Sequence, residues 1–341
     1  MSGSIRSVGC GAGAAAFASR ACSRALDKVP RALREHLERT NFRGERVTLA
    51  EGLEVASALT AGALAGLGAA SAAAMAIVSV VGFGDDVLEP LLMREGEKTP
   101  PKGLKGHLGA LALGQFTTGN VKILGIAAAA GVLACECAHM REREGSDASH
   151  APRAMALVDR SLDTVLIAAS ANLANLFDLR PSRALKATTF GALLSCAGPA
   201  SSRSARSRAA LASAHAAAAL FAAPRDFRAR GMLGDAGANV LGANVGSMAA
   251  LSTSRAFRVT LTAAAVALTL VSERVSFTRV IASSEVLTAI DRDLGGIEKL
   301  QTDFNAAGGR VFGSGWVFVT VDRSGKLALA SRPNQDSPLM D

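Results

Sequence analysis

Uncharged, alanine-rich runs alternate with short charged segments along most of the chain. The longest run, 55–84, contains no Asp, Glu, Lys or Arg. It is long enough for one tilted membrane span or for a tight hairpin of two short ones. Most of the other runs are shorter than the roughly 20 residues that a lone span needs, so polar ends and helix packing must complete them. These shorter runs are 123–135, 164–177, 187–202, 209–224, 236–254 and 259–272.

The pattern predicts two domains with different structures. Residues 1–281 are expected to form an all-α polytopic membrane domain with about nine transmembrane helices. Residues 287–341 are expected to form a small α+β tail. The hydrophobic residues make up 49% of the chain, but the apolar content is mostly Ala and Gly, and the mean hydropathy is only +0.27. A soluble alanine-rich helical bundle therefore remains an alternative, and it would be extracted without detergent.

The formal net charge of +8 suggests an anionic partner. The basic residues are not clustered as in DNA-reading proteins, and aromatic residues make up only 4% of the chain. These features exclude nucleic acid from the expected partners and favour anionic lipid or phosphorylated substrates.

Loop charges predict the orientation in the membrane. The basic loop 26–47 is placed in the cytoplasm by the positive-inside rule. Counting spans from this loop brings the acidic segments at 85–86, 178 and 235 to the same cytoplasmic face. The segment 201–208, which contains three arginines, then lies outside, against the rule.

Carboxylates at span ends are costly unless they are paired, solvated or bound to a cation. We expect them to hold Mg²⁺, which takes oxygen ligands and bridges the phosphates of a nucleotide substrate. The expected catalytic residues are Asp85, Asp86 and Asp235, and the expected metal ligands are Asp178 and Asp235. The expected substrate-binding residues are Asn172, Asn175, Arg180, Arg183, Lys186, Arg228 and Arg230. The alternative roles are interhelical hydrogen bonding for the amides and membrane anchoring for the cations.

Three motifs carry a family resemblance over residues 39–279: GFGDD at 82–86, NLANLFD at 172–178 and GDAGANVLG at 234–242. This region resembles the polyprenyl-phosphate N-acetylhexosamine-1-phosphate transferases, which include phospho-N-acetylmuramoyl-pentapeptide transferase. The resemblance implies Mg²⁺-dependent transfer of a sugar-1-phosphate from a UDP-sugar to a polyprenyl phosphate at the bilayer, and a homodimer is compatible with it. The chain departs from the family at 178–183, where DLRPSR replaces Asp-Gly-Leu-Asp-Gly-Leu, and it lacks the late histidine-rich loop.

The tail predicts a helical start followed by a hairpin with strands at 316–322 and 327–330. It resembles the C-terminal domain of iron/manganese superoxide dismutases at 303–307, 312–316, 325–327 and 334–341. That family holds its metal with three His and one Asp, whereas no histidine follows His215 in this chain. The tail is therefore interpreted as a truncated half-domain. The alternative functions are a dismutase-related protein and a non-catalytic membrane scaffold.

Overall fold

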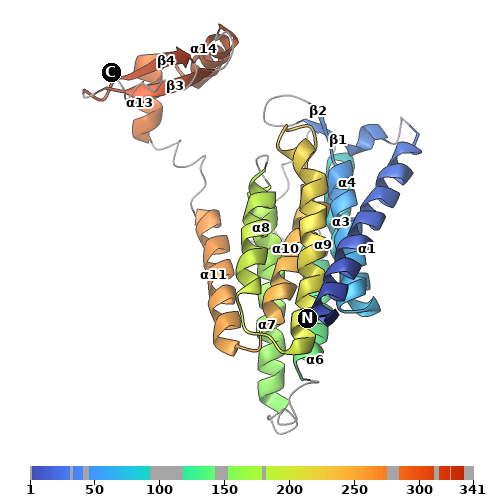
Figure 1. The fold of residues 1–341 in the computed structure, drawn as a ribbon. Helices are drawn as coiled ribbons and strands as arrows, with labels where there is room; N and C mark the ends of the chain where they lie inside the picture. Colours follow the sequence, from blue (N-terminus) through green and yellow to red (C-terminus); the bar gives the residue numbers. More distant parts are fainter. Residues whose placement is uncertain are drawn as a thin grey trace. The chain divides into compact units, whose positions relative to one another are not determined.

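The chain divides into two compact units, Met1–Val271 and Ser272–Asp341, in a computed structural model. The first unit is a bundle of long helices, and the second combines two helices with a two-stranded sheet (Figure 1). The structure describes residues 2–30, 34–40, 46–92, 118–142, 153–178, 182–274, 284–310, 315–322 and 324–333.

The first unit is built from helices that follow the apolar runs. These helices are α1 (Ser2–Asp27), α3 (Ala50–Gly66), α4 (Ala69–Leu92), α6 (Thr118–Glu142), α7 (Arg153–Phe177), α8 (Arg183–Cys196), α9 (Ser202–Asp226), α10 (Gly234–Ala250) and α11 (Arg255–Arg274). The long run 55–84 lies in two successive helices, α3 and α4, as a helical hairpin requires, and α4 contains a candidate membrane span. The turn between them uses Gly68 at φ +110°, a conformation that L side chains rarely adopt.

The expected loop at 26–47 also contains secondary structure. A short 3₁₀ turn, η1 (Glu35–Leu37), leads into an antiparallel pair of strands, β1 (Glu38–Thr40) and β2 (Arg46–Thr48). Thr48 forms a parallel bridge to Gly231, just before α10. The pair therefore packs the basic loop against the end of the bundle at which α10 begins.

Helix α10 lies at the centre of the bundle and is buried along almost its whole length. Its small residues let neighbouring helices approach closely. A Cβ added at Gly242 would lie 2.2 Å from the carbonyl oxygen of Ser170 in α7, and one added at Gly237 would lie 2.7 Å from Gly52 Cα in α3. Packing at small residues replaces bulky side chains in this core, which explains the modest hydropathy of the chain.

Three segments of the described chain are long and apolar enough to cross a membrane: Ala69–Val87, Gly119–Arg141 and Arg255–Ser272. The expected nine transmembrane helices are therefore not confirmed. The apolar runs were counted as spans although several of their helices are short or carry charges. Helix α8 has 14 residues and α10 has 17, while α9 includes three arginines before its apolar part.

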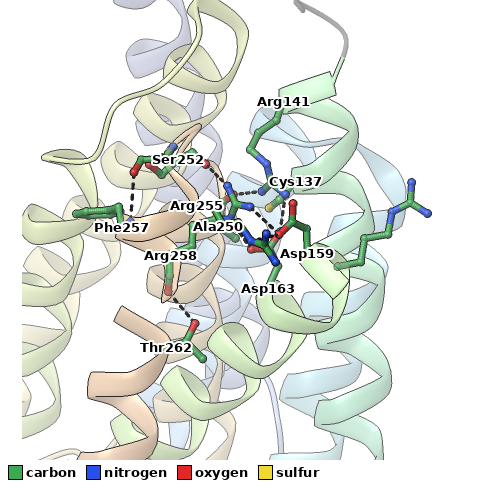
Figure 2. A network of polar contacts seen from close by, with 12 residues as sticks. Cys137, Arg141, Asp159, Asp163, Ala250, Ser252, Arg255, Phe257, Arg258 and Thr262 are labelled. Atoms are coloured by element: carbon green, nitrogen blue, oxygen red, sulfur yellow. Dashed lines mark hydrogen bonds and ion pairs between the residues drawn. The ribbon is translucent and has the colours of Figure 1, made fainter. Parts of the chain in front are cut away.

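A buried ionic network joins α6, α7 and α11 (Figure 2). Asp163 on α7 is fully buried and pairs with Arg141 at 2.5 Å and with Arg258 at 2.9 Å. Asp159, one turn earlier, pairs with Arg255 at 2.9 Å. Arg141 also donates to the carbonyl of Ala250. The network fastens α11 to the bundle at the end where α6 finishes and α7 starts.

The second unit contains α13 (Ser284–Leu294), α14 (Ile297–Arg310) and the antiparallel strands β3 (Gly315–Val321) and β4 (Leu327–Pro333). The predicted hairpin is thus confirmed. Its turn is closed by Asp322, which accepts hydrogen bonds from the backbone N–H groups of Ser324 and Lys326. Asp293 at the end of α13 accepts from the N–H of Leu327 at 2.7 Å, so one carboxylate joins the helix to β4.

Replacing Asp163 by Asn is expected to destabilise the first unit. The change leaves two arginine side chains without their buried counter-charge, a loss on the order of 3 kcal/mol in free energy of unfolding. The measurement is denaturant unfolding of detergent-purified protein, with Asp303→Asn as the control because it removes only an exposed ion pair with Lys299. If the Asp163→Asn protein is as stable as the control, the ionic network contributes nothing to the free energy of unfolding.

Acid is expected to weaken the second unit through Asp293. The Arg292 side chain and the Leu327 N–H lower the pKa of Asp293 from the ordinary 3.8 to about 2. The folded-state pKa of Asp293 lies below the ordinary value, so its ionised carboxylate stabilises the folded second unit. This contribution to the free energy of unfolding is complete above the ordinary pKa and is lost as the pH falls through about 2. Urea unfolding followed by the fluorescence of Trp316, the one tryptophan of the chain, measures this loss. Asp293→Asn should be less stable at pH 6 and should lack this acid-sensitive component; an unchanged pH dependence contradicts the role of Asp293.

Candidate functional site

Two of the predicted catalytic carboxylates meet around a lysine. Lys122, near the start of α6, has its Nζ 2.5 Å from Asp85 Oδ2 on α4 and donates as well to Asp235 Oδ2 on α10. The three side chains are only 10–19% exposed. The structure therefore brings together the acidic segments at 85–86 and 235, as the sequence predicts.

Sequence reasoning missed Lys122 itself. It is the single charged residue between Gly119 and Cys135, within an otherwise apolar helix. A lone cation in such a run is expensive unless it has a buried partner. The unfavourable burial of Lys122 in an apolar run therefore predicts a carboxylate partner on another helix.

Asp86 is held by the start of α10. Its Oδ2 accepts hydrogen bonds from the backbone N–H groups of Asp235 at 2.8 Å and of Ala236 at 3.4 Å. An anion at a helix N-terminus is stabilised by the exposed N–H groups and the helix dipole. Gly234 makes the approach possible, because its φ is +57° and an added Cβ would lie 2.7 Å from Asp86 Oδ2. Asp86 thus caps α10 and aligns it with α4.

Asp178, a predicted metal ligand, lies at the end of α7 close to the same helix start. Burial raises the pKa of Asp178 well above its ordinary value, and the carboxylate of Asp226 raises it further, while a hydrogen bond from the Gly234 N–H lowers it. Asp226 accepts a hydrogen bond from the Ser182 N–H at 3.0 Å. Asp178 therefore lies within electrostatic range of both Asp226 and Asp235.

The predicted phosphate-binding cations are placed differently from one another. Arg183 donates to the carbonyl of Phe177 at 3.3 Å, and the Nζ of Lys186 lies 5.5 Å from the ring centre of Phe227. Arg228 and Arg230 are exposed on the segment that leads to α10. Arg180 lies outside the described residues.

The two predicted asparagines line a pocket beside Lys122. This pocket has a volume of about 280 Å³ and lies between α6, α7, α10 and α11. Its polar lining consists of Lys122, Asn172, Asn175, Asn239 and Thr269. Its apolar walls are Ile123, Ile126, Ala127, Val165, Ala168, Ala169, Val266 and Leu270. Asn239 is fixed by donation to the Asp235 carbonyl at 2.7 Å, so the pocket and the ionic cluster are structurally connected.

A metal ion does not fit the arrangement of these carboxylates. Within the ranges that the structure describes, no group of three or more His, Cys, Asp or Glu side chains is placed to hold one. The ammonium of Lys122 lies between Asp85 and Asp235, where a bridging cation would have to bind. The ammonium of Lys122 pairs with both of these carboxylates instead.

The family that matches this chain does so in its tail. Residues 282–341 match the family described as iron/manganese superoxide dismutases, C-terminal domain. Manganese superoxide dismutase 1 of Leptolyngbya boryana is 47% identical over 55 residues, which are 16% of this chain and 22% of that protein. The manganese enzyme of Acinetobacter baylyi is 44% identical over 59 residues, 17% of this chain and 26% of that protein. The manganese/iron enzyme of Porphyromonas gingivalis is 45% identical over 51 residues, 15% of this chain and 27% of that protein.

These relatives overturn the expected cofactor. They are manganese or manganese/iron enzymes, so they point to Mn or Fe, and the expectation of Mg²⁺ was wrong. The matched segment contains neither His nor Cys, so it does not by itself fit such a metal. No solved structure matches the chain. The chain spans about a quarter of the length of these relatives, and what the comparisons show is that residues 282–341 correspond to the C-terminal domain of iron/manganese superoxide dismutases.

Proposed function

We propose that the first unit binds a polyprenyl phosphate in the pocket beside Lys122 and transfers to it a sugar-1-phosphate from a UDP-sugar. The observation that carries the proposal is the position of Lys122, which belongs both to the Asp85–Asp235 cluster and to the lining of an apolar pocket. A ligand that contacts both the charged cluster and the apolar pocket has a charged head and a long hydrocarbon chain. The family resemblance of residues 39–279 supplies the reaction.

Different lining residues of the pocket suit the two ends of such a lipid. The Ile, Val, Leu and Ala side chains suit the hydrocarbon chain, and a candidate span, Arg255–Ser272, forms one wall. The Lys122 ammonium is a compact point charge suited to the phosphate head. The amides of Asn172 and Asn175 are placed to donate hydrogen bonds to phosphate or sugar oxygens.

The reaction balances without a covalent enzyme intermediate. An oxygen of the lipid phosphate attacks the phosphorus that carries the sugar, a new P–O–P bond forms, and the bond to the UMP oxygen breaks. UMP leaves with the electron pair of that bond. Lys122 acts by holding the attacking phosphate against the cluster, so its contribution is positioning and charge stabilisation.

The charge of the cluster sets a condition on the substrate. Asp85, Asp86 and Asp235 outnumber the one ammonium of Lys122, and two substrates with phosphates add more negative charge. In this proposal the nucleotide substrate therefore brings its own counter-charge to the site. In this proposal the protein is a multi-pass protein of the cell membrane, and the Lys122 end faces the cytoplasm.

A second candidate function comes from the tail. The match at 282–341 favours a dismutase-related protein in which the tail is a structural half-domain and the first unit is its membrane scaffold. This reading predicts either iron or manganese bound in stoichiometric amount or no chemistry at all. Metal analysis of the full-length protein, combined with a superoxide consumption assay, measures it directly.

The transferase proposal predicts that Lys122→Met and Asp235→Asn lower the rate of UMP release at least 100-fold. Removing a group that stabilises transferred charge typically costs 10²–10³ in rate. UMP release from UDP-N-acetylhexosamines with undecaprenyl phosphate is measured on detergent-purified protein. Lys299→Met, the same substitution at an exposed lysine of the second unit, is the control and should keep the wild-type rate.

Folding of the variants must be checked, because loss of Lys122 leaves two carboxylates unpaired. Lys122→Arg keeps the positive charge but replaces the point charge by a planar fork, and it should fold while releasing UMP slowly. Size-exclusion chromatography establishes folding. A folded Lys122→Met protein with the wild-type rate, or a wild-type protein inactive with every donor, contradicts the proposal.

A further inference from the structure

Helix α9 carries two buried polar side chains on one face, close to its start. Ser204 is fully buried and Arg208 is only 5% exposed. Because they are four residues apart in the helix, both side chains project from the same side of α9. Serine and arginine are mostly exposed in folded proteins, and a buried arginine is costly unless its N–H groups are hydrogen-bonded. The hydrogen bonds of this pair therefore need to be accounted for.

The guanidinium of Arg208 is only partly hydrogen-bonded. Its Nη1 donates to the carbonyl of Gly198, in the link between α8 and α9. Its Nε and Nη2 are buried, and in the described part of the chain neither has a hydrogen-bond partner. Nε and Nη2 form the edge of the guanidinium on which two N–H groups run parallel, and this edge binds two oxygens of one anion at the same time. Arg208 thus keeps its paired donors for an acceptor other than the described residues.

The hydroxyl of Ser204 is also unpaired. Its Oγ is buried and makes no hydrogen bond among the residues that the structure describes. Buried serines in the middle of these helices donate to the carbonyl four residues earlier, as Ser247 does to Ala243 at 2.8 Å. Ser204 lies in the first turn of α9, so the corresponding carbonyl precedes the helix. Its backbone N–H is already capped by the Ser201 hydroxyl, so it is the side chain of Ser204 that is available.

The described neighbours of the guanidinium are weak acceptors. The thiols of Cys137 in α6 and Cys196 in α8 lie within electrostatic range of Arg208. Cys137 donates its S–H to the carbonyl of Ser247 at 3.5 Å, so this thiol is engaged with α10. Sulfur accepts hydrogen bonds poorly. A negatively charged oxygen acceptor suits the open edge of Arg208 much better than these thiols do.

Close packing around the pair limits the size of the ligand. Gly198, whose carbonyl binds Arg208, lies so near α11 that an added Cβ would be 2.6 Å from the ring of Phe257. The carbonyl of Pro199 accepts a hydrogen bond from the Thr253 N–H at 2.9 Å. The link between α8 and α9 is thus held against the turn between α10 and α11. A ligand that reaches two buried side chains among such contacts has few atoms.

The pair is remote from the proposed transferase site. Lys122 is near the start of α6, and Cys137, which lies near Arg208, is 15 residues further along the same helix. This separation corresponds to about 22 Å along the helix axis. An inference about Arg208 and Ser204 therefore does not depend on the proposed function.

We propose that Arg208 and Ser204 bind a small, singly charged oxyanion that has two oxygens on one side, as formate and bicarbonate do. The two oxygens accept hydrogen bonds from Nε and Nη2 of Arg208, and one of them also accepts from the Ser204 hydroxyl. The single negative charge balances the single guanidinium charge. The bound anion fixes Arg208, and through Gly198 it holds the link between α8 and α9 in place.

The test measures Tm of the full-length protein in neutral detergent, from the circular dichroism of its helices. At constant ionic strength, gluconate, which is too bulky for the buried pair, is replaced stepwise by formate, bicarbonate or chloride. Formate and bicarbonate should raise Tm in a saturable way. Chloride has no paired oxygens and should not raise Tm over the same concentrations. The ratio of the formate and bicarbonate affinities shows which of the two oxyanions the site prefers.

Two conservative variants separate the contributions of the pair. Arg208→Lys keeps the charge but removes the paired donors, so the apparent affinity for formate should fall at least tenfold. Ser204→Ala removes one donor and should lower the affinity by about two- to tenfold. The control is Arg206→Lys, the same substitution at an exposed arginine two residues away in α9, and it should bind formate like wild type.

Three outcomes contradict the proposal. The first is a formate affinity that is unchanged in both Arg208→Lys and Ser204→Ala; Ser204→Ala decides alone if Arg208→Lys lacks the wild-type dichroism. The second is an equal rise of Tm with chloride, which excludes recognition of paired oxygens. The third is a Tm that does not respond to any of the anions, which means that the buried N–H and O–H groups bind water only.

Discussion

The ion pairs of Lys122 with Asp85 and Asp235 are the contact on which the first unit depends. They join α4, α6 and α10 at one point, and the three residues are far apart in the sequence. Each of these charges is costly in a mostly buried position, and each is tolerable only because the others are present. Asp86 adds to the same junction by capping α10. The start of the central helix, and hence the pocket along it, is fixed by charges and not by bulky apolar side chains.

In the rest of the bundle, too, small residues provide close packing while ion pairs fix which helices lie together. Between its ends, Ala and Gly allow helix backbones to touch, as at Gly242 against α7 and Gly11 against α9. Such contacts give close packing but little sequence-specific shape, because small side chains interlock in many registers. The Asp163 network at one end and the Lys122 cluster at the other supply that specificity, since buried ion pairs are strongly destabilised when one partner is displaced.

The amino-acid sequence predicts local features well and long-range partners poorly. The helical hairpin in 55–84 and the strand pair of the tail follow from run length, Gly68 and alternation. The structure does bring Asp85 and Asp235 together, but the span count from which the sequence analysis expected this is not confirmed. Lys122 was missed because its meaning depends on carboxylates 37 and 113 residues away. The count of nine spans is not confirmed, since three segments of the described chain are long and apolar enough to cross a membrane. Run length does not show which helices lie inside the bundle.

The tail shows how a family match and a function can separate. Asp293 joins α13 to β4, and Asp322 and Gly325 close the hairpin turn. These contacts specify a fold, and they lie within the region that matches the superoxide dismutase domain. Redox chemistry needs ligands of another kind, and the matched region has no His or Cys to offer. The likeness of 282–341 therefore identifies a domain, while the buried charge clusters around Lys122 and Asp163 belong to the first unit. The chemistry of the chain is best sought where its charges are most costly, around Lys122.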